Sequence, residues 1–215
     1  MDPEDVAFYR WYGPWAPLTP PEVAVMFAGL GAPWWIVGGW AIEAFTHRAR
    51  PHEDIDVAFF RADLPLVLER LEPELCVWSN ASGTLRPLKR LDDLLEGCRQ
   101  LWVRRDGGSP WLMDLAITPH DGGTWISVRD DRVRLPLEDA VFVGADGIRY
   151  LRPEIVMGLK ARNPRPSSDA DLEAVLPLLD AGARTSLRDA IALYDPGHPW
   201  LERVGGPGAD DGSEP

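Results

Sequence analysis

The sequence predicts an α+β protein in which a mixed β-sheet flanked by helices is followed by a helical C-terminal part. First, strand-like and helical segments are interspersed up to Leu151 without a long regular βαβ alternation. Second, the periodic segments after Pro153 have helical spacing. Third, 45% hydrophobic and 26% charged residues in a chain of 215 are typical of a globular protein with one ample core. We expect an α/β domain over 1–152, a helical subdomain over 153–204 and a disordered tail over 205–215.

The N-terminal half contains a well-marked helix start. Thr19 can cap the helix, Pro20 occupies its first position, and Glu22 completes a capping box. The helix should end near Gly29 to Gly31, and apolar runs and turn residues mark the elements that follow. They are a strand over 32–37, a helix over 40–47, a strand over 54–60 and a helix over 62–71.

Two hairpins and three helices account for most of the remaining chain. The first hairpin pairs 100–104 with 111–117 across a turn that contains Asp106-Gly107-Gly108. The second covers 125–135, whereas the stretch from residue 72 to Glu96 carries weaker signals. The other expected elements are a short strand over 147–151 and helices over 153–162, 169–179 and 183–193, with a linker over 163–168.

The charge balance and the cysteines argue against several classes of protein. Acidic residues outnumber basic ones 34 to 22, so the formal net charge is -12 and the chain repels nucleic-acid backbones. Cys76 and Cys98 form no CxxC pair, which argues against a disulfide-stapled secreted fold and a thiolate zinc site. The N-terminus lacks a signal-peptide pattern, and no apolar run is long enough to span a membrane. We therefore expect a cytoplasmic protein that binds neither membranes nor, stably, nucleic acids.

Three aspartates are the candidate catalytic and metal-binding residues. Side chains alternate along a strand, so Asp54 and Asp56 should project to one side while Ile55 enters the core. Two carboxylates that close repel each other unless a divalent cation neutralises them. Asp114, inside the later strand 111–117, offers a third carboxylate. Magnesium is the expected ion because it prefers carboxylate oxygens and is completed by substrate phosphates. An Asp-x-Asp sequence alone could also be a solvated turn or a cap.

A glycine pair between the strand 32–37 and the next helix suggests a phosphate site. Gly38 and Gly39 lack a Cβ, so backbone N–H groups at the helix start can approach phosphate oxygens. No Gly-Lys-Ser/Thr follows, so the segment is not a P-loop. Such a pair can equally form a tight turn without any ligand.

Taken together, these motifs resemble the nucleotidyltransferase superfamily related to DNA polymerase β, and within it the small aminoglycoside 2''-adenylyltransferase-like enzymes. The motifs that carry the resemblance are Gly38-Gly39-Trp40-Ala41, Arg50-Pro51-His52-Glu53-Asp54-Ile55-Asp56 and the later strand residue Asp114. Less specific matches extend it over most of residues 21–201. Gly158 interrupts the helix that carries Lys160, and the stretch between Asp56 and Asp114 departs from the family pattern.

The resemblance implies transfer of a nucleoside monophosphate from an NTP, with ATP expected, to a hydroxyl group, with release of pyrophosphate. It implies Asp54 and Asp56 as ligands of two Mg²⁺ ions and Asp114 as third ligand or general base. Lys160 is the first candidate for neutralising the triphosphate, with Arg50 and Arg48 as further candidates. The remaining nucleotide-binding candidates are Gly38, Gly39 and Trp40.

Each of these side chains also has a plain structural interpretation. Trp40 could pack rather than line a nucleotide pocket, and most of the other tryptophans sit in core-like contexts. Lys160 and Arg162 could form a solvated helix face, and His52 could be structural. Asp169 and Asp171 fit a helix start favoured by the helix dipole, although they could instead meet a cationic acceptor.

The sequence therefore predicts a magnesium-dependent nucleotidyltransferase for a small hydroxylated acceptor, and the acidic chain favours a cationic, aminoglycoside-like one. Antibiotic resistance is one expected role. One alternative is a toxin-type nucleotidyltransferase that modifies RNA or protein. Another is a catalytically silent nucleotide-binding or interaction module.

Overall fold

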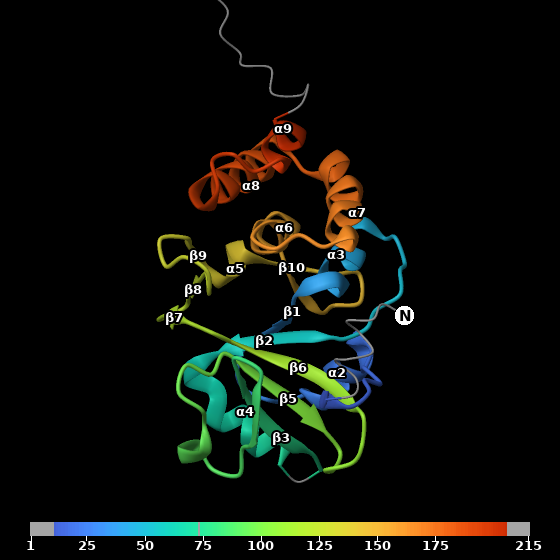
Figure 1. The fold of residues 1–215 in the computed structure, drawn as a ribbon, viewed down its shortest axis with the longest axis vertical. Helices are drawn as coiled ribbons and strands as arrows, with labels where there is room; N and C mark the ends of the chain where they lie inside the picture. The colour runs from blue at the N-terminus through green and yellow to red at the C-terminus, as the bar shows by residue number, and fades with distance from the viewer. Residues whose placement is uncertain (1–10, 73, 206–215) are drawn as a thin grey trace, which may run out of the picture.

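The computed structural model describes residues 11–72 and 74–205. Its largest element is an eight-stranded mixed sheet in the order β10-β11-β1-β2-β6-β5-β3-β4 (Figure 1). The strands are β1 Trp34–Ile36, β2 Asp56–Phe60, β3 Cys76–Ala81, β4 Thr84–Pro87, β5 Gln100–Arg104, β6 Trp111–Thr118, β10 Val141–Val143 and β11 Arg149–Leu151. A smaller sheet contains β7 His120–Asp121, β8 Thr124–Ile126 and β9 Arg134–Pro136.

The centre of the large sheet positions the predicted carboxylates. β2 pairs with β1 antiparallel and with β6 parallel, and the register places Asp56 beside Asp114. Ile36, Val57 and Leu115 on these strands are fully buried. β2 is buried along almost its whole length, because it has a strand on each side and helices pack over the sheet.

Helices cover the sheet and form the C-terminal part. The α-helices are α2 Pro20–Met26, α3 Gly38–Thr46, α4 Leu64–Leu71, α5 Leu137–Ala140, α6 Pro153–Ala161, α7 Pro166–Val175, α8 Ala181–Tyr194 and α9 Trp200–Val204. In Figure 1, α6 to α9 stack on the side of α3 that faces away from β2. α3 contacts both α6 and α7, so this helix joins the sheet to the C-terminal helices.

Local signals explain two of these helices. Both the backbone N–H and the hydroxyl of Thr19 donate to Glu22 Oε2 at 2.7 Å, so the predicted start of α2 is confirmed. α6 continues through Gly158 without a break. A Cβ at Gly158 would lie 3.4 Å from Ala190 Cβ, so the glycine allows α8 to pack closely against α6. This glycine therefore serves helix packing.

The predicted α+β fold, the hairpin of β5 with β6 and the hairpin of β8 with β9 are confirmed. Four differences concern the start of β2, the hairpin of β3 with β4, the strand β10 and the start of α7. β2 begins at Asp56 rather than Asp54, and the Asp54 carbonyl accepts a hydrogen bond from the Trp40 indole (3.2 Å). β3 and β4 form a hairpin within the weakly patterned stretch, and β10 pairs with β11. α7 begins at Pro166, inside the predicted linker.

Two expectations lie at the chain ends. The predicted disordered tail falls, apart from Gly205, outside the described residues, and the acidic N-terminus also lies outside them. Within the described part of the chain, no helix is long and apolar enough to cross a membrane. The boundary at residue 152 between a sheet domain and a helical subdomain stays a prediction.

Candidate functional site

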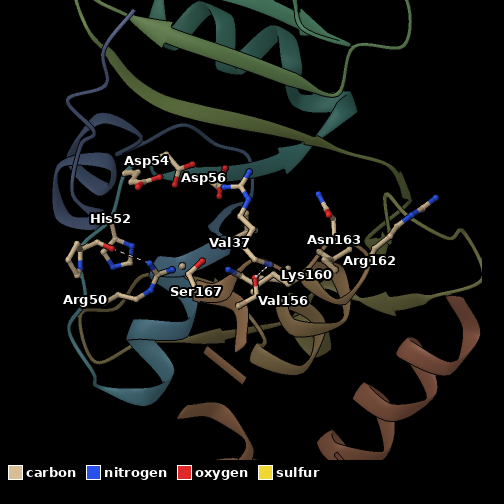
Figure 2. Close-up of a pocket in the computed structure, with 18 of the residues that line it drawn as sticks. Val37, Arg50, His52, Asp54, Asp56, Val156, Lys160, Arg162, Asn163 and Ser167 are labelled. Carbon is tan, nitrogen blue, oxygen red and sulfur yellow. Dashed lines mark hydrogen bonds between the residues drawn. The ribbon is translucent and has the colours of Figure 1, made fainter. Parts of the chain in front are cut away.

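A cleft of about 910 Å³ lies between the start of β2 and the helices α6 and α7. Figure 2 shows Asp54 and Asp56 on one side of it and Lys160 and Ser167 on the other. Sequence-predicted residues that line it are Gly38, Gly39, Arg50, His52, Asp54, Asp56, Lys160 and Arg162. Residues that were not predicted are Arg129, Asn163, Arg165, Ser167 and Ser168, among others.

Asp114 lies next to Asp56 but deeper in the sheet. Its side chain is 7% exposed, and its Oδ2 atom accepts hydrogen bonds from Gln100 Nε2 (2.8 Å) and Trp102 Nε1 (3.1 Å). Its Oδ1 atom is buried and has no hydrogen-bond partner among the described residues. An unpartnered buried carboxylate oxygen is costly, so this atom is suited to receive a ligand or a proton.

The two neighbouring carboxylates strongly influence each other. Burial, reinforced by the charge of Asp54, raises the pKa of Asp56 to about 7, although Lys160 and Arg165 act in the opposite direction. Burial and the charge of Asp56 raise the pKa of Asp114 well above its ordinary value. Both pKa shifts have the direction expected where burial and a neighbouring carboxylate disfavour the ionised form, which a bound cation would favour.

The glycine pair at the start of α3 packs closely against Asp56 and Arg50. Gly38 is the first residue of α3 and has a φ of +66°, a left-handed conformation that glycine adopts without strain. A Cβ at Gly38 would collide with Asp56 Oδ2, and a Cβ at Gly39 would collide with Arg50 Nη2. The glycines therefore allow a carboxylate and a guanidinium to reach the start of the helix.

Trp40 and Glu43 on α3 hold the segment that carries Asp54. The rings of Trp40 and His52 stack with centroids 3.8 Å apart, and the Trp40 indole donates to the Asp54 carbonyl. Glu43 Oε2 lies 2.8 Å from His52 Nε2 and accepts from the Arg50 backbone N–H at 3.0 Å. Burial lowers the pKa of His52. Trp40 is absent from the residues that line the cleft, so it acts here as support for the loop.

Two cations of the cleft, Arg50 and Lys160, form ion pairs with the buried carboxylate of Asp171. The sequence had suggested a helix-start role for this residue. Asp171 Oδ2 accepts from Lys160 Nζ at 2.9 Å, and Asp171 Oδ1 lies 3.4 Å from Arg50 Nε. The signal for this role was its position: Asp171 shares the buried face of α7 with Leu172 and Val175. Arg48, by contrast, is exposed and outside the cleft lining.

The described residues contain no group of three or more His, Cys, Asp or Glu side chains arranged to hold a metal ion. Asp54 is exposed, Asp56 half-buried and Asp114 buried. The structure thus brings Asp56 and Asp114 side by side, and the set of three metal ligands stays a prediction.

Comparison with known proteins gives this geometry a context. The family model described as aminoglycoside-2''-adenylyltransferase matches residues 21–86, a segment that contains the glycine pair and both Asp54 and Asp56. The structure of the lincosamide antibiotic adenylyltransferase LnuA, bound to lincomycin, has a TM-score of 0.53 at 14% identity and covers 76% of this chain and 100% of LnuA. The chain has the nucleotidyltransferase fold.

Two structures of ANT(2'')-Ia share this nucleotidyltransferase fold. The crystal structure of its complex with adenylyl-2''-tobramycin has a TM-score of 0.53 at 14% identity, over 81% of this chain and 95% of that one. Its solution structure has a TM-score of 0.50 at 16% identity, over 94% and 97%. No curated protein matches the chain in sequence. The predicted resemblance is confirmed by the family match and by the fold, and LnuA and ANT(2'')-Ia are nucleotidyltransferases.

Proposed function

We propose that this protein is a magnesium-dependent nucleotidyltransferase that moves a nucleoside monophosphate, with ATP as the expected donor, to a hydroxyl of a small acceptor. The observation that supports it most is the register of β2 and β6, which places Asp56 beside Asp114 directly under the start of α3. Gly38 and Gly39, the carboxylates Asp54 and Asp56, and the cations of the opposite wall then line one cleft, and Asp114 lies beside Asp56.

Two observations on the neighbouring carboxylates support a magnesium ion at this site. Asp114 Oδ1 is buried without a hydrogen-bond partner among the described residues, and the pKa of the adjacent Asp56 is raised by burial. Asp56 and Asp114, joined by Asp54 from the preceding loop, would hold the metal, with two ions expected. Bound Mg²⁺ would neutralise charge on the phosphates and on the attacking and leaving oxygens.

The protein's own groups supply the remaining functions. The first N–H groups of α3, at Gly38 and Gly39, would bind phosphate oxygens, while Lys160 and Arg50 would neutralise the triphosphate. Gln100 and Trp102 hold Asp114 Oδ2 and leave Oδ1 available. Where Asp114 acts as general base, Oδ1 would accept the proton of the acceptor hydroxyl.

For the acceptor, we propose a hydroxylated antibiotic of the aminoglycoside or lincosamide type. The support is the match to the adenylyltransferase family and the fold shared with LnuA and ANT(2'')-Ia. The net charge of -12 favours a cationic compound. The basic residues of the cleft, among them Arg129, Arg162 and Arg165, instead suit the triphosphate.

Pyrophosphate release tests this proposal. The purified protein is incubated with each NTP, with magnesium or EDTA, against aminoglycosides, lincosamides, other hydroxyl compounds, tRNA and candidate proteins. We expect release that requires Mg²⁺ and a small hydroxylated acceptor, together with a mass increase of the acceptor by one nucleoside monophosphate. Labelling of tRNA or protein alone would favour a toxin-type enzyme. NTP binding without any turnover would contradict the proposal and indicate a silent module.

Replacement of Trp40 tests the support of the Asp54 loop. Trp40→Phe keeps an aromatic ring against His52 but removes the N–H that donates to the Asp54 carbonyl. One hydrogen bond contributes about 0.5–1.5 kcal/mol, so we expect kcat/KM to fall by about 2- to 12-fold. Trp11→Phe is the control, because Trp11 is 80% exposed. Equal activity of both variants would show that the loop does not need this bond.

A further inference from the structure

Asp171 is the buried carboxylate that links two cations of the cleft. It lies on α7 and is 4% exposed. Its two oxygens are used separately: Oδ2 accepts from Lys160 Nζ at 2.9 Å, and Oδ1 lies 3.4 Å from Arg50 Nε. Arg50 precedes β2 and Lys160 belongs to α6, so one side chain connects three segments that are distant in the sequence.

The position of Asp171 separates it from the residues that meet a ligand. Arg50 and Lys160 line the cleft, whereas Asp171 does not and lies behind them. In Figure 2, Arg50 and Lys160 lie on the side of the cleft opposite Asp54 and Asp56. A buried carboxylate is stable only when it is paired, so Asp171 and its two cations depend on one another.

The contacts with Asp171 leave most donors of the cations available. An ammonium group has three N–H donors and a guanidinium group has five. Lys160 donates one to Asp171, whereas Arg50 Nε faces Asp171 Oδ1 as an ion pair without a hydrogen bond, and Arg50 Nη1 donates to the Pro51 carbonyl at 3.1 Å. Arg50 Nη2 approaches Gly39, where the first N–H groups of α3 begin. The pair of cations is therefore held with free donors beside the predicted phosphate site.

We propose that Asp171 is a positioning residue for the triphosphate, because it fixes Arg50 and Lys160 in the arrangement that the β- and γ-phosphates require. This inference rests on the proposed function and adds a residue that does not itself contact the nucleotide. Without the carboxylate, two like charges in one partly buried wall would repel each other and separate. The affinity for the nucleotide should then decrease.

Binding of magnesium with a non-hydrolysable ATP analogue, measured by calorimetry on the full chain, tests this role. Asp171→Asn keeps the shape but removes the charge. Since hydrogen bonds to charged groups are worth about ten- to one-hundred-fold in affinity, we expect the Kd to rise by that factor. In turnover assays the KM for ATP should rise, with kcat changed much less. Asp171→Ser serves if the asparagine variant does not fold.

The matched control is Asp169→Asn on the same helix. Asp169 Oδ1 accepts from Arg203 Nη1 and Trp200 Nε1, both at 2.8 Å, and Asp169 is not among the residues that line the cleft. We expect this variant to bind the analogue like the unmodified protein. A loss of affinity equal to that of Asp171→Asn would mean that any disturbance of α7 weakens binding, which would overturn the specific role of Asp171.

A variant lacking both cations provides a readout that a purely structural role would not move. In an Arg50→Met/Lys160→Met background, Asp171 has neither cation to position, so Asp171→Asn should not weaken binding further and should raise the melting temperature. A similar loss of affinity in both backgrounds would overturn the proposal. Unmodified protein that binds no nucleotide would overturn the proposed function as well, whereas normal binding by Asp171→Asn would overturn only the role of Asp171.

Discussion

Asp56→Asn is expected to lower kcat/KM for nucleotidyl transfer by at least about 1,000-fold while the protein remains folded. Asp56 is the carboxylate that lies beside Asp114 in the sheet and against Gly38 at the start of α3. Loss of a metal ligand removes several kcal/mol of transition-state stabilisation, and each 1.36 kcal/mol corresponds to about a factor of ten in rate. Pyrophosphate release with the preferred acceptor measures the effect.

The thermal transition distinguishes this loss from misfolding. The folded protein keeps two desolvated carboxylates side by side, as the raised pKa values of Asp56 and Asp114 indicate. Asparagine removes one of these charges, so the melting temperature of Asp56→Asn should stay unchanged or rise. Asp92→Asn is the control, because Asp92 is exposed and follows β4, the edge strand of the sheet. An Asp56→Asn enzyme with a tenth of normal activity would contradict the metal assignment.

Gly38→Ala is expected to lower both activity and stability. The φ of +66° costs an L-residue about 1–2 kcal/mol, and the new Cβ would collide with Asp56 Oδ2. For a chain of this size, that strain lowers the melting temperature by about 2–8 °C. Displacement of Asp56 should reduce transfer by about 100-fold or more, since small misplacements at a reacting centre have effects of that order. Circular dichroism and pyrophosphate release measure the two effects.

Two other glycines separate strain from displacement. Gly147 has a φ of +78° with nothing within 4 Å of an added Cβ, so Gly147→Ala should lower the melting temperature but leave activity unchanged. At Gly39, where φ is not in the left-handed region, the added Cβ would meet Arg50 Nη2 and, at 3.1 Å, His52 Nδ1. Gly39→Ala should therefore lower the melting temperature less than Gly38→Ala, while its displacement of Arg50 should weaken nucleotide binding. Equal activity of the Gly38 and Gly147 variants would show that the contact with Asp56 is unimportant.

Several features of the site could be predicted from the sequence because they depend on local chemistry. Glycine adopts the left-handed start of α3 without strain, and the strand alternation correctly placed Ile55 in the core. The turn with Asp106 marked the hairpin of β5 and β6, since Asp106 Oδ1 accepts from the Gly108 and Ser109 N–H groups. Each of these signals lies within a few residues.

Other features could not be predicted because they depend on long-range pairing. β10 has only three residues and exists as a strand because it pairs with β11. β3 likewise pairs with β5, and the edge strand β4 pairs with β3, whereas the weak alternation of their sequence did not indicate these partners. Trp40 became a support for Asp54 only once folding brought its indole to a carbonyl fourteen residues away.

By itself, the sequence determined the candidate reactive groups of this protein: two carboxylates two residues apart, a glycine pair before a helix, and a later aspartate within an apolar strand. These groups are recognised from residue type and short spacing, which do not depend on the tertiary structure. Tertiary structure decided their partners. The parallel pairing of β2 with β6 placed Asp114 beside Asp56, and the packing of α7 placed Asp171 behind Arg50 and Lys160. The physical reason is that burial makes an unpaired charge costly, and the fold alone determines which opposite charge or ligand can reach it.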